Sequence, residues 1–438
     1  MTRTPILLVG EISVDVTLTS PSQEDKMRLG GIVHAARGLW AFGHPYAVAA
    51  VLPSYLVDPA RSYLEKIGCS EFINLGEVTG SPNITLIRDA SEVADQGYED
   101  LLREEKQVRL IGGGVHGYAE VLIFPGSYDL AEVCSRLPSN SVLHLDVAYD
   151  LEDVDSLSRL PLPVETIFIS TSSQLFTSLW RNTFKDFAAL FFESGAKAFV
   201  LKENRGGSRL AFHGGDDVLN LPAQLGSTVN SVGVGDVFAA TYVATRTSGI
   251  KEAGWRATYA AAAYSQTTYP ERFQENVQRD LKLSVEEMEG LGGVSLTWEA
   301  RQEVQIYLAA PDFSYVDSRP LKRAIDAFMY HNFRLRRPIA ENGELPEGSS
   351  QSVLKSTFNA DYELLLECDL VFAVPINRDP GTLVEIGIAL EAGIPVVVFD
   401  PAEENGNTMV MAGSRYYSPD LDLCLNKTFE LLSRKEGS

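Results

Sequence analysis

Short apolar runs rich in β-branched residues alternate with longer helix-forming segments along most of the chain. Examples of these runs are residues 46–52 (YAVAAVL), 121–124 (VLIF), 142–146 (VLHLD), 166–169 (TIFI) and 198–201 (AFVL). Each run has the length of a β-strand, and strands that alternate with helices favour parallel pairing, because parallel neighbours need a crossover connection. The sequence therefore predicts an α/β fold with mainly parallel sheets.

The chain is long enough for more than one domain. At 438 residues it exceeds the length at which a single hydrophobic core usually stops growing. Residues 274–305 are rich in Glu, contain a GLGG break at 290–293 and show little strand character, which indicates a helical linker. We expect a first domain at 1–300 that includes this linker, and a second domain at 301–438.

The α/β pattern starts again after the expected linker. Residues 304–310 (VQIYLAA) indicate a new first strand, an amphipathic helix is expected around 320–336, and another helix is expected at about 351–367. The remaining length suits a small doubly wound α/β domain of the flavodoxin-like kind.

Composition excludes several classes of function. The chain has 37 basic and 59 acidic residues and a net charge of -22, which disfavours binding to a nucleic-acid polymer or an anionic membrane. The 4 cysteines and 6 histidines show no spacing typical of a metal site or of a disulfide framework, so we expect no bound metal from them. No apolar run reaches membrane-spanning length, and residues 5–10 are too short for a signal sequence. We expect a soluble cytoplasmic protein.

Residues 377–387 (NRDPGTLVEIG) are the strongest candidates in the chain for a catalytic site. They lie between predicted strands at 369–375 and 394–400, and a helix is expected to begin near Thr382. Asp379 then follows the carboxyl end of a strand, where ligands bind in open parallel sheets. Glu385 is expected on the first helical turn, where the helix dipole and free backbone N–H groups stabilise an anion.

An anionic Glu385 suits a nucleophile in glycosidic-bond cleavage. Cleavage with retention needs one carboxylate to attack the sugar carbon and a second acid to protonate the leaving group. Asp361, on the preceding predicted helix, and Asp379 are the nearby candidates for the second role. The structural alternative is that Asp379 initiates a turn and Glu385 complements a helix N-terminus.

The second domain resembles a known enzyme family. Residues 304 to about 415 are similar to nucleoside 2-deoxyribosyltransferases in the segments 306–313 (IYLAAPDF), 361–372 (DYELLLECDLVF), 379–387 (DPGTLVEIG) and 407–409 (NTM). This resemblance implies that Glu385 attacks C1′ of a nucleoside and forms a covalent glycosyl-enzyme intermediate. It also implies that Tyr307 positions Glu385, and that Asp361 and Asp379 hold and protonate the departing base.

The resemblance carries further expectations about ligands and assembly. The expected substrate-binding residues are Gly381, Asn407 and Met409. A homo-oligomer is implied, because the family builds its site across subunits, and glycosyl transfer would need no cofactor. The same residues also fit a nucleoside 5′-monophosphate N-glycosidase, in which water intercepts the intermediate. A non-catalytic nucleotide-binding sensor is the remaining alternative.

A glycine-rich loop marks the first domain. Residues 229–240 (VNSVGVGDVFAA) lead into a predicted helix, where backbone N–H groups can hold a phosphate, although a plain helix-entry turn has the same glycines. Together with residues 10–15 (GEISVD) and 30–43 (GGIVHAARGLWAFG), the loop resembles the ribokinase-like (PfkB) carbohydrate and nucleoside kinases over residues 5 to about 290.

The kinase resemblance assigns roles to several residues. Asp236 would remove the proton of the acceptor hydroxyl, and Asp15 and Gly31 would hold the sugar. The phosphate-binding residues would be Gly233, Val234 and Gly235. ATP and Mg²⁺ are the expected cofactors if this domain is an active kinase.

The first domain also departs from the kinase pattern. Asn230 stands where an acidic residue usually opens the loop, and His34 stands where an Asn usually contacts the sugar. The Asn and Glu that support metal and phosphate are replaced within 170–174 (STSSQ), and hydroxyl groups bind Mg²⁺ more weakly than carboxylates do. The domain is therefore either an active kinase or a degenerate ligand-binding domain.

Overall fold

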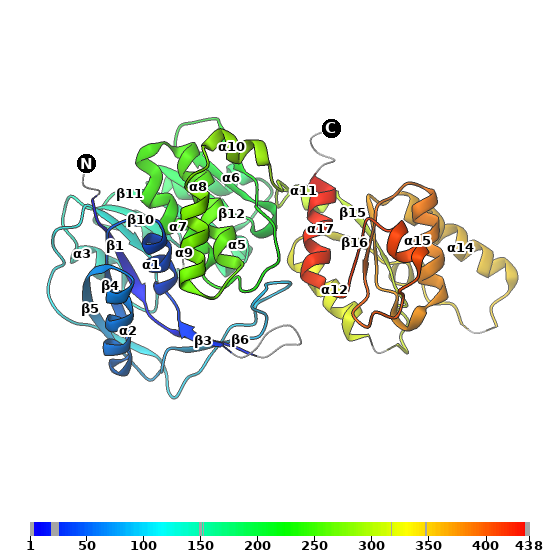
Figure 1. The fold of residues 1–438 in the computed structure, drawn as a ribbon, viewed down its shortest axis with the longest axis horizontal. Coiled ribbons are helices and arrows are strands. Elements are labelled where there is room, and N and C mark those ends of the chain that lie inside the picture. Colours follow the sequence, from blue (N-terminus) through cyan, green and yellow to red (C-terminus); the bar gives the residue numbers. More distant parts are fainter. Residues whose placement is uncertain are drawn as a thin grey trace. The chain divides into compact units, whose positions relative to one another are not determined.

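The structure is a computed structural model that describes residues 4–18, 26–148, 151, 153–316, 318–346 and 348–433. Contacts within the chain divide it into two compact units (Figure 1). The first unit comprises Met1–Glu92, Gln96–Gln224 and Thr228–Ser295, and the second comprises Val93–Asp95, Leu225–Ser227 and Leu296–Ser438.

A 10-stranded sheet forms the centre of the first unit, in the order β14-β13-β12-β11-β10-β9-β1-β4-β5-β8. Its strands are β1 (Ile6–Glu11), β4 (Tyr46–Leu52), β5 (Cys69–Thr79), β8 (Gln107–Leu110), β9 (Glu120–Ile123), β10 (Val142–Asp146), β11 (Val164–Ser170), β12 (Ala198–Lys202), β13 (Ser208–Phe212) and β14 (Val218–Leu221). The strands from β12 to β5 are parallel, and β13, β14 and β8 add antiparallel edges. Every residue of β4 is buried, as expected for a strand covered on both faces.

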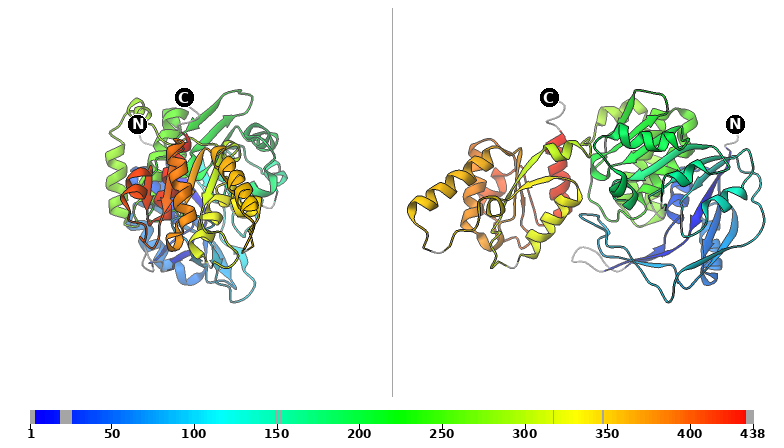
Figure 2. Two further views of the ribbon diagram at one scale, coloured as in Figure 1. Left: turned by 90° about the vertical axis from the view of Figure 1, so that its right-hand side faces the viewer. Right: turned by 180° about the vertical axis from the view of Figure 1, so that it is seen from behind.

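Helices cover both faces of this sheet (Figures 1 and 2). They are α1 (Val33–Ala41), α2 (Val57–Lys66), α3 (Leu130–Ser135), α4 (Asp155–Ser158), α5 (Gln174–Leu179), α6 (Phe184–Glu193), α7 (Val234–Thr245), α8 (Ile250–Ser265), α9 (Pro270–Asp280) and α10 (Val285–Leu291). Neighbouring residues of β12 show the two faces: Phe199 stacks on Phe191 of α6, whereas Val200 joins the cluster of α7 and α8.

A small second sheet in the first unit has the strand order β3-β2-β6-β7. Its strands are β2 (Val14–Thr17), β3 (Lys26–Leu29), β6 (Ile84–Ile87) and β7 (Glu99–Asp100). Arg28 of β3 donates hydrogen bonds to Asn230 Oδ1 at 2.8 Å and to the Val232 carbonyl at 2.9 Å. This sheet is therefore fastened to the loop that precedes α7.

The second unit contains a 5-stranded parallel sheet in the order β16-β15-β17-β18-β19. Its strands are β15 (Gln305–Ala309), β16 (Arg334–Arg336), β17 (Leu370–Ala373), β18 (Val396–Phe399) and β19 (Tyr416–Ser418). The helices are α11 (Ala300–Glu303), α12 (Arg319–Tyr330), α13 (Pro338–Asn342), α14 (Gln351–Leu366), α15 (Pro380–Glu391), α16 (Thr408–Gly413) and α17 (Leu421–Ser433). The strand order is the flavodoxin-like doubly wound one, and the predicted fold class is confirmed.

One helix of the second unit is shorter than predicted. The helix expected around 320–336 ends at Tyr330, and Arg334–Arg336 instead form the edge strand β16. Asn332 lies between them with φ 66°, a left-handed conformation that Asn tolerates and that ends a helix. The strand has only three residues, too few for its polar and apolar residues to show a period.

Alternating side chains of β15 and β17 pack against helices on opposite faces of the second sheet. Phe372 makes an edge-to-face contact with Phe328 of α12, with ring centroids 4.7 Å apart. On the other face, Tyr307, Val371 and Ile386 belong to one buried cluster with residues of α14 and α15. This cluster sets α15 against the centre of the sheet. No helix among the described residues is long and apolar enough to span a bilayer.

Candidate functional sites in the two units

A buried hydrogen bond joins the sheet to α15 in the second unit. Tyr307 Oη, from β15, donates to Glu385 Oε1, from α15, at 2.7 Å. The Tyr307 side chain is fully buried, and burial together with the Glu385 charge raises the pKa of its phenol far above the ordinary value. Tyr307 therefore stays protonated and holds one oxygen of Glu385 in place.

The surroundings of Glu385 disfavour its charged form. Burial is the main reason that the pKa of Glu385 is raised to about 7; the Tyr307 hydrogen bond lowers it, and the charges of Asp361 and Asp379 raise it. The effects of these two charges show that the three predicted carboxylates lie within electrostatic reach of one another. The strand order reverses beside β15, so this is also the crevice in which doubly wound sheets bind ligands.

The prediction that the helix N-terminus stabilises Glu385 as an anion is wrong. Helix α15 begins at Pro380, which places Glu385 in its second turn, beyond the free N–H groups of the first. The dipole weakens within one turn, so burial dominates and the pKa of Glu385 rises instead of falling. Helix α15 begins at Pro380, two residues before the expected start at Thr382, because proline is well suited to the first position of a helix.

Asp379 caps α15. Its Oδ2 accepts hydrogen bonds from the Thr382 backbone N–H at 2.7 Å and from Thr382 Oγ1 at 2.9 Å. Asp379 therefore has the structural role that was the alternative to catalysis, at the start of the helix. Its charge also raises the pKa of Glu385. Gly381 is the second residue of α15, where an added Cβ would come within 3.1 Å of Asp379 Oδ2.

Asp361 and Asn407 have their own partners in the second unit. Asp361, half-buried on α14, accepts a hydrogen bond from Asn342 Nδ2 at 2.7 Å through Oδ1. Asn407 caps α16 by accepting from the Met409 N–H at 2.9 Å, and the Met409 side chain is exposed. Neither Asn407 nor Met409 hydrogen bonds to Glu385 within the described part of this chain. Their assignment to substrate binding stays a prediction.

Sequence reasoning missed a buried network that holds the loop after β18. Asp400 Oδ2 accepts hydrogen bonds from Tyr417 Oη at 2.6 Å and from the Asn405 N–H at 2.7 Å. Asn405 Nδ2 in turn donates to the Pro375 carbonyl at 2.7 Å, which ties this loop to the turn that precedes Asp379. Asp400 ends a predicted strand, and its position there was the only signal in the sequence.

In the first unit, the glycine-rich loop forms an uncapped helix N-terminus. Gly233 is the N-cap of α7, with φ 81° and without a side-chain capping bond. An added Cβ at Gly233 would lie 2.1 Å from His34 Cγ, so glycine is required by both conformation and space. Asp236 lies in the first turn, and burial, followed by the charge of Asp146, raises its pKa to about 7.

Asp15 and Gly31, the two residues of the first unit that are expected to bind a sugar, are in close contact with other protein groups. Asp15 is buried; its Oδ2 lies 2.8 Å from His34 Nε2, and its Oδ1 accepts a hydrogen bond from Ser13 Oγ at 3.0 Å. Burial lowers the pKa of His34 to about 4, so its neutral ring donates to Asp15 and accepts from Tyr264 Oη. Gly31 has a φ of 58°, and a Cβ added there would lie 2.2 Å from the Glu11 carbonyl oxygen. The sugar-binding role of Asp15 and Gly31 stays a prediction.

Sequence reasoning also missed an ion pair in the first unit. Lys202, at the end of β12, lies with its Nζ 2.6 Å from Asp146 Oδ2, at the end of β10. Both side chains are buried, and Lys202 Nζ also lies 3.5 Å from the Gly235 carbonyl. The only sequence signal was that both residues stand where predicted parallel strands end.

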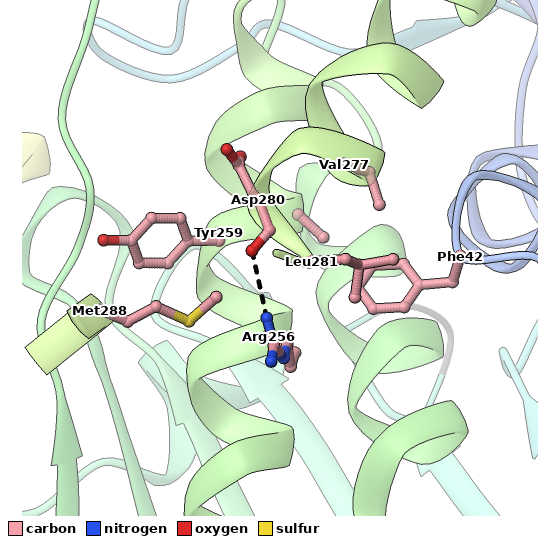
Figure 3. A pocket seen from close by; sticks show the side chains of 8 residues that line it. Phe42, Arg256, Tyr259, Val277, Asp280, Leu281 and Met288 are labelled. Carbon is pink, nitrogen blue, oxygen red and sulfur yellow. Dashed lines mark hydrogen bonds between the residues drawn. The ribbon is translucent and has the colours of Figure 1, made fainter. Parts of the chain in front are cut away.

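A small pocket in the first unit contains none of the predicted site residues (Figure 3). Apolar side chains from several helices form its wall, and Arg256 Nη1 donates to the Asp280 carbonyl at 3.1 Å. Its lining residues are Phe42, Arg256, Tyr259, Ala260, Val277, Asp280, Leu281 and Met288. We assign it no functional role.

Residues 306–424 match the family model of nucleoside 2-deoxyribosyltransferase. The match covers the segment that holds Tyr307, Asp361, Asp379 and Glu385. No curated protein matches the chain. The matched family is an enzyme family.

Solved structures of ribokinases and a related kinase are similar to part of the chain. Ribokinase from Thermotoga maritima has 17% identity and a TM-score of 0.45, and the match covers 64% of this chain and 100% of that one. Ribokinase from Giardia lamblia has 12% identity and a TM-score of 0.47, with coverage of 64% and 99%. The nucleoside kinase of Methanocaldococcus jannaschii has 12% identity and a TM-score of 0.42, with coverage of 64% and 100%.

The two roles of Asp379 can be separated by substitution. Asp379→Ser keeps an oxygen that can cap α15, whereas Asp379→Ala removes the cap and is expected to cost about 1 kcal/mol of stability. Denaturant unfolding of both variants measures this difference. Equal destabilisation by both variants would show that the hydrogen bonds to Thr382 do not stabilise the helix.

The raised pKa of Glu385 makes a prediction about stability. Its pKa rises from an ordinary 4.5 to about 7 on folding, so the folded state binds more protons and loses stability as pH rises through this window. Glu385→Gln cannot ionise and is expected to gain about 1–3 kcal/mol relative to the parent between about pH 4 and about pH 8. Thermal melts across this range, with Glu391→Gln on the exposed end of α15 as control, measure the gain. A difference that does not change with pH would contradict the assignment.

Proposed function

We propose that the second unit cleaves the N-glycosidic bond of a nucleoside or nucleotide through Glu385 and transfers the ribosyl or 2-deoxyribosyl group to another base. The observation that carries the proposal is the 2.7 Å bond from Tyr307 Oη to Glu385 Oε1, with Asp361 and Asp379 close enough to affect the same carboxylate. Such a cluster supplies both a nucleophile and an acid, the two groups that retaining cleavage needs.

The proposed reaction has two displacements. Carboxylate Glu385 attacks C1′, the bond between C1′ and the base nitrogen breaks, and Asp361 or Asp379 gives a proton to the departing base. The acid that gave its proton then takes one from the incoming base, whose nitrogen displaces Glu385 and restores the free enzyme. Tyr307 binds Oε1, which leaves Oε2 as the attacking atom. With its pKa near 7, Glu385 is substantially ionised at neutral pH and is a better nucleophile than an ordinary carboxylate.

Water in place of the second base would give hydrolysis by the same residues. The similarity of the segments around Asp379 and Asn407 to transferases supports transfer, and a nucleoside 5′-monophosphate N-glycosidase remains the second candidate. The two activities differ in one product: only hydrolysis releases free sugar when no acceptor base is present.

Self-association is proposed from the exposed face of α14. Leu354, Phe358, Tyr362 and Leu366 follow one another at intervals of four residues and are 40–53% exposed. This spacing places them on one face of the helix, which also bears Asp361 one residue before Tyr362. An apolar stripe beside a predicted acid supports a homo-oligomer whose subunits share the site.

We also propose a cytoplasmic location.

The first unit is proposed to bind a sugar-like or nucleotide-like ligand at the N-terminus of α7. Asp236 is placed in the first turn of that helix, beside amides without a side-chain cap. ATP is the proposed cofactor if kinase activity is retained.

Base exchange tests the function of the second unit. The protein is incubated with a deoxynucleoside or ribonucleoside and a different free base, and the new nucleoside is followed by chromatography. Glu385→Ala is expected to lower the rate about 10³-fold or more, since the covalent step is lost. A sugar adduct on Glu385, detected by mass spectrometry after quenching, would establish attack by this residue. The control is Glu391→Ala in the same helix. Full activity of Glu385→Ala would refute the proposal.

The pH profile tests the partnership of Tyr307 and Glu385. Because Glu385 must be ionised to attack, the initial rate is expected to rise with pH, with a midpoint at about 7. Tyr307→Phe removes the hydrogen bond that lowers this pKa, so the midpoint of the profile is expected to move to higher pH. Tyr417→Phe, which removes a phenol bonded to Asp400, is the matched control and should leave the midpoint unchanged. An unmoved midpoint in Tyr307→Phe would show that this bond does not tune Glu385.

A further inference from the structure

Two loops of the second unit are joined by hydrogen bonds at the carboxyl ends of neighbouring parallel strands. The first loop, residues 374–379, follows β17, and the second loop, residues 400–407, follows β18. Asn405 of the second loop donates from Nδ2 to the Pro375 carbonyl of the first loop at 2.7 Å. Asn405 is 5% exposed, and its backbone N–H bonds to Asp400 Oδ2 at 2.7 Å. A buried and firmly held amide therefore fixes the beginning of the first loop.

A second contact joins the same loops on their exposed side. Arg378 Nε donates to the Glu404 carbonyl at 2.8 Å. Arg378 directly precedes Asp379, whose own backbone N–H bonds to the Ile376 carbonyl at 3.1 Å. We call the two bonds from Asn405 and Arg378 the loop clasp. The clasp holds the first loop at its beginning and again immediately before Asp379.

The loops of the clasp contain an unfavourable backbone conformation. Asn377 and Arg378 have φ angles of 54° and 55°, and Glu403 in the second loop has a φ of 51°. Asparagine tolerates this left-handed region, whereas arginine and glutamate rarely adopt it, because the Cβ atom crowds the following carbonyl oxygen. Glycine would adopt it without this strain. A tie that only stabilised the fold does not need strained residues, and strain of this kind is concentrated where it fixes a functional group.

Asp379 is the functional group that the clasp holds. Its backbone lies between the clasp on one side and α15 on the other, where the Thr382 N–H and Oγ1 bond to Asp379 Oδ2. The other candidate acid, Asp361, lies on α14 and bonds to Asn342, so the clasp does not act on it directly. A change in the clasp is therefore expected to move Asp379 and to leave Asp361 in place.

We propose that Arg378 and Asn405 are positioning residues for the reaction of the second unit, and that they act by holding Asp379 where it meets the base. The inference rests on the proposed function of this unit and adds two residues that do not themselves contact the substrate. Displacing a group that acts in the transition state by about 1 Å can lower a rate about 100-fold. Loss of the clasp therefore affects kcat more than it affects binding of the nucleoside.

Kinetics of base exchange by the full chain test the clasp. Arg378→Gly removes the guanidinium and relieves the left-handed strain, which offsets the lost hydrogen bond, so its melting temperature is expected to stay close to that of the parent. Its kcat is expected to fall about tenfold or more, with a smaller change in KM for the nucleoside. A contact that only stabilised the fold would lower the melting temperature and leave kcat unchanged. Arg415→Ala, at an exposed arginine just before β19, is the control and should match the parent.

A double variant separates action through Asp379 from action elsewhere in the unit. Asp379→Asn removes the carboxylate and keeps an oxygen that can cap α15. In this background Arg378→Gly is expected to lower kcat no further, because its effect passes through the carboxylate that is already absent. Asn405→Ala is expected to give the same pattern as Arg378→Gly. It removes a buried side chain and can fail to fold, whereas Arg378 is exposed.

The outcomes distinguish the clasp from the function on which it rests. An unchanged kcat in Arg378→Gly would overturn the inference, and so would a further fall in kcat when Arg378→Gly is added to Asp379→Asn. In both cases the parent is active, and the proposed function stands. A parent chain that neither exchanges nor releases a base, and that forms no sugar adduct on Glu385, would refute the proposed function and the clasp together.

Discussion

The hydrogen bond between Tyr307 and Glu385 is the contact on which the proposed chemistry of the second unit depends. It joins a central strand to a helix across the buried cluster that contains Val371 and Ile386, so neither partner can move without disturbing the core. Burial gives Glu385 a pKa near 7, and the phenol keeps part of the carboxylate ionised. The same apolar surroundings that hold the helix in place therefore set the reactivity of the carboxylate.

The two units use their parallel sheets in the same way. In each, the chemically distinctive residues follow the carboxyl ends of strands or occupy the first turns of the next helix: Asp146, Lys202 and Asp236 in the first, Asp379 and Glu385 in the second. In each, burial raises the pKa of one carboxylate to about 7. The difference lies in the nearby charges. Lys202 counters the acidic residues around Asp236, whereas the two charges that act on Glu385, those of Asp361 and Asp379, both add to the effect of burial.

Much of the fold could be predicted because buried parallel strands are continuous apolar runs. The prediction at 142–146 coincides with β10, and that at 46–52 coincides with β4. Short or polar edge strands such as β16 lack this signal. The grouping of carboxylates around Glu385 could be anticipated from motif spacing. The side-chain network of Asp400, Asn405 and Tyr417, and the pairing of Lys202 with Asp146, depend on contacts between distant segments that no local pattern records. The charge state of Glu385 was misjudged because burial is a tertiary property.

The cap at the start of α15 has a consequence for the cost of reaching the transition state. Two hydrogen bonds to Thr382 fix Oδ2 of Asp379, so the rotation of this side chain is restricted before any ligand arrives. Its other oxygen, Oδ1, consequently has a direction set by folding rather than by binding. In the proposed reaction, a side chain ordered in advance would lose little entropy when a base docks against it, and folding would already supply part of its alignment for proton transfer.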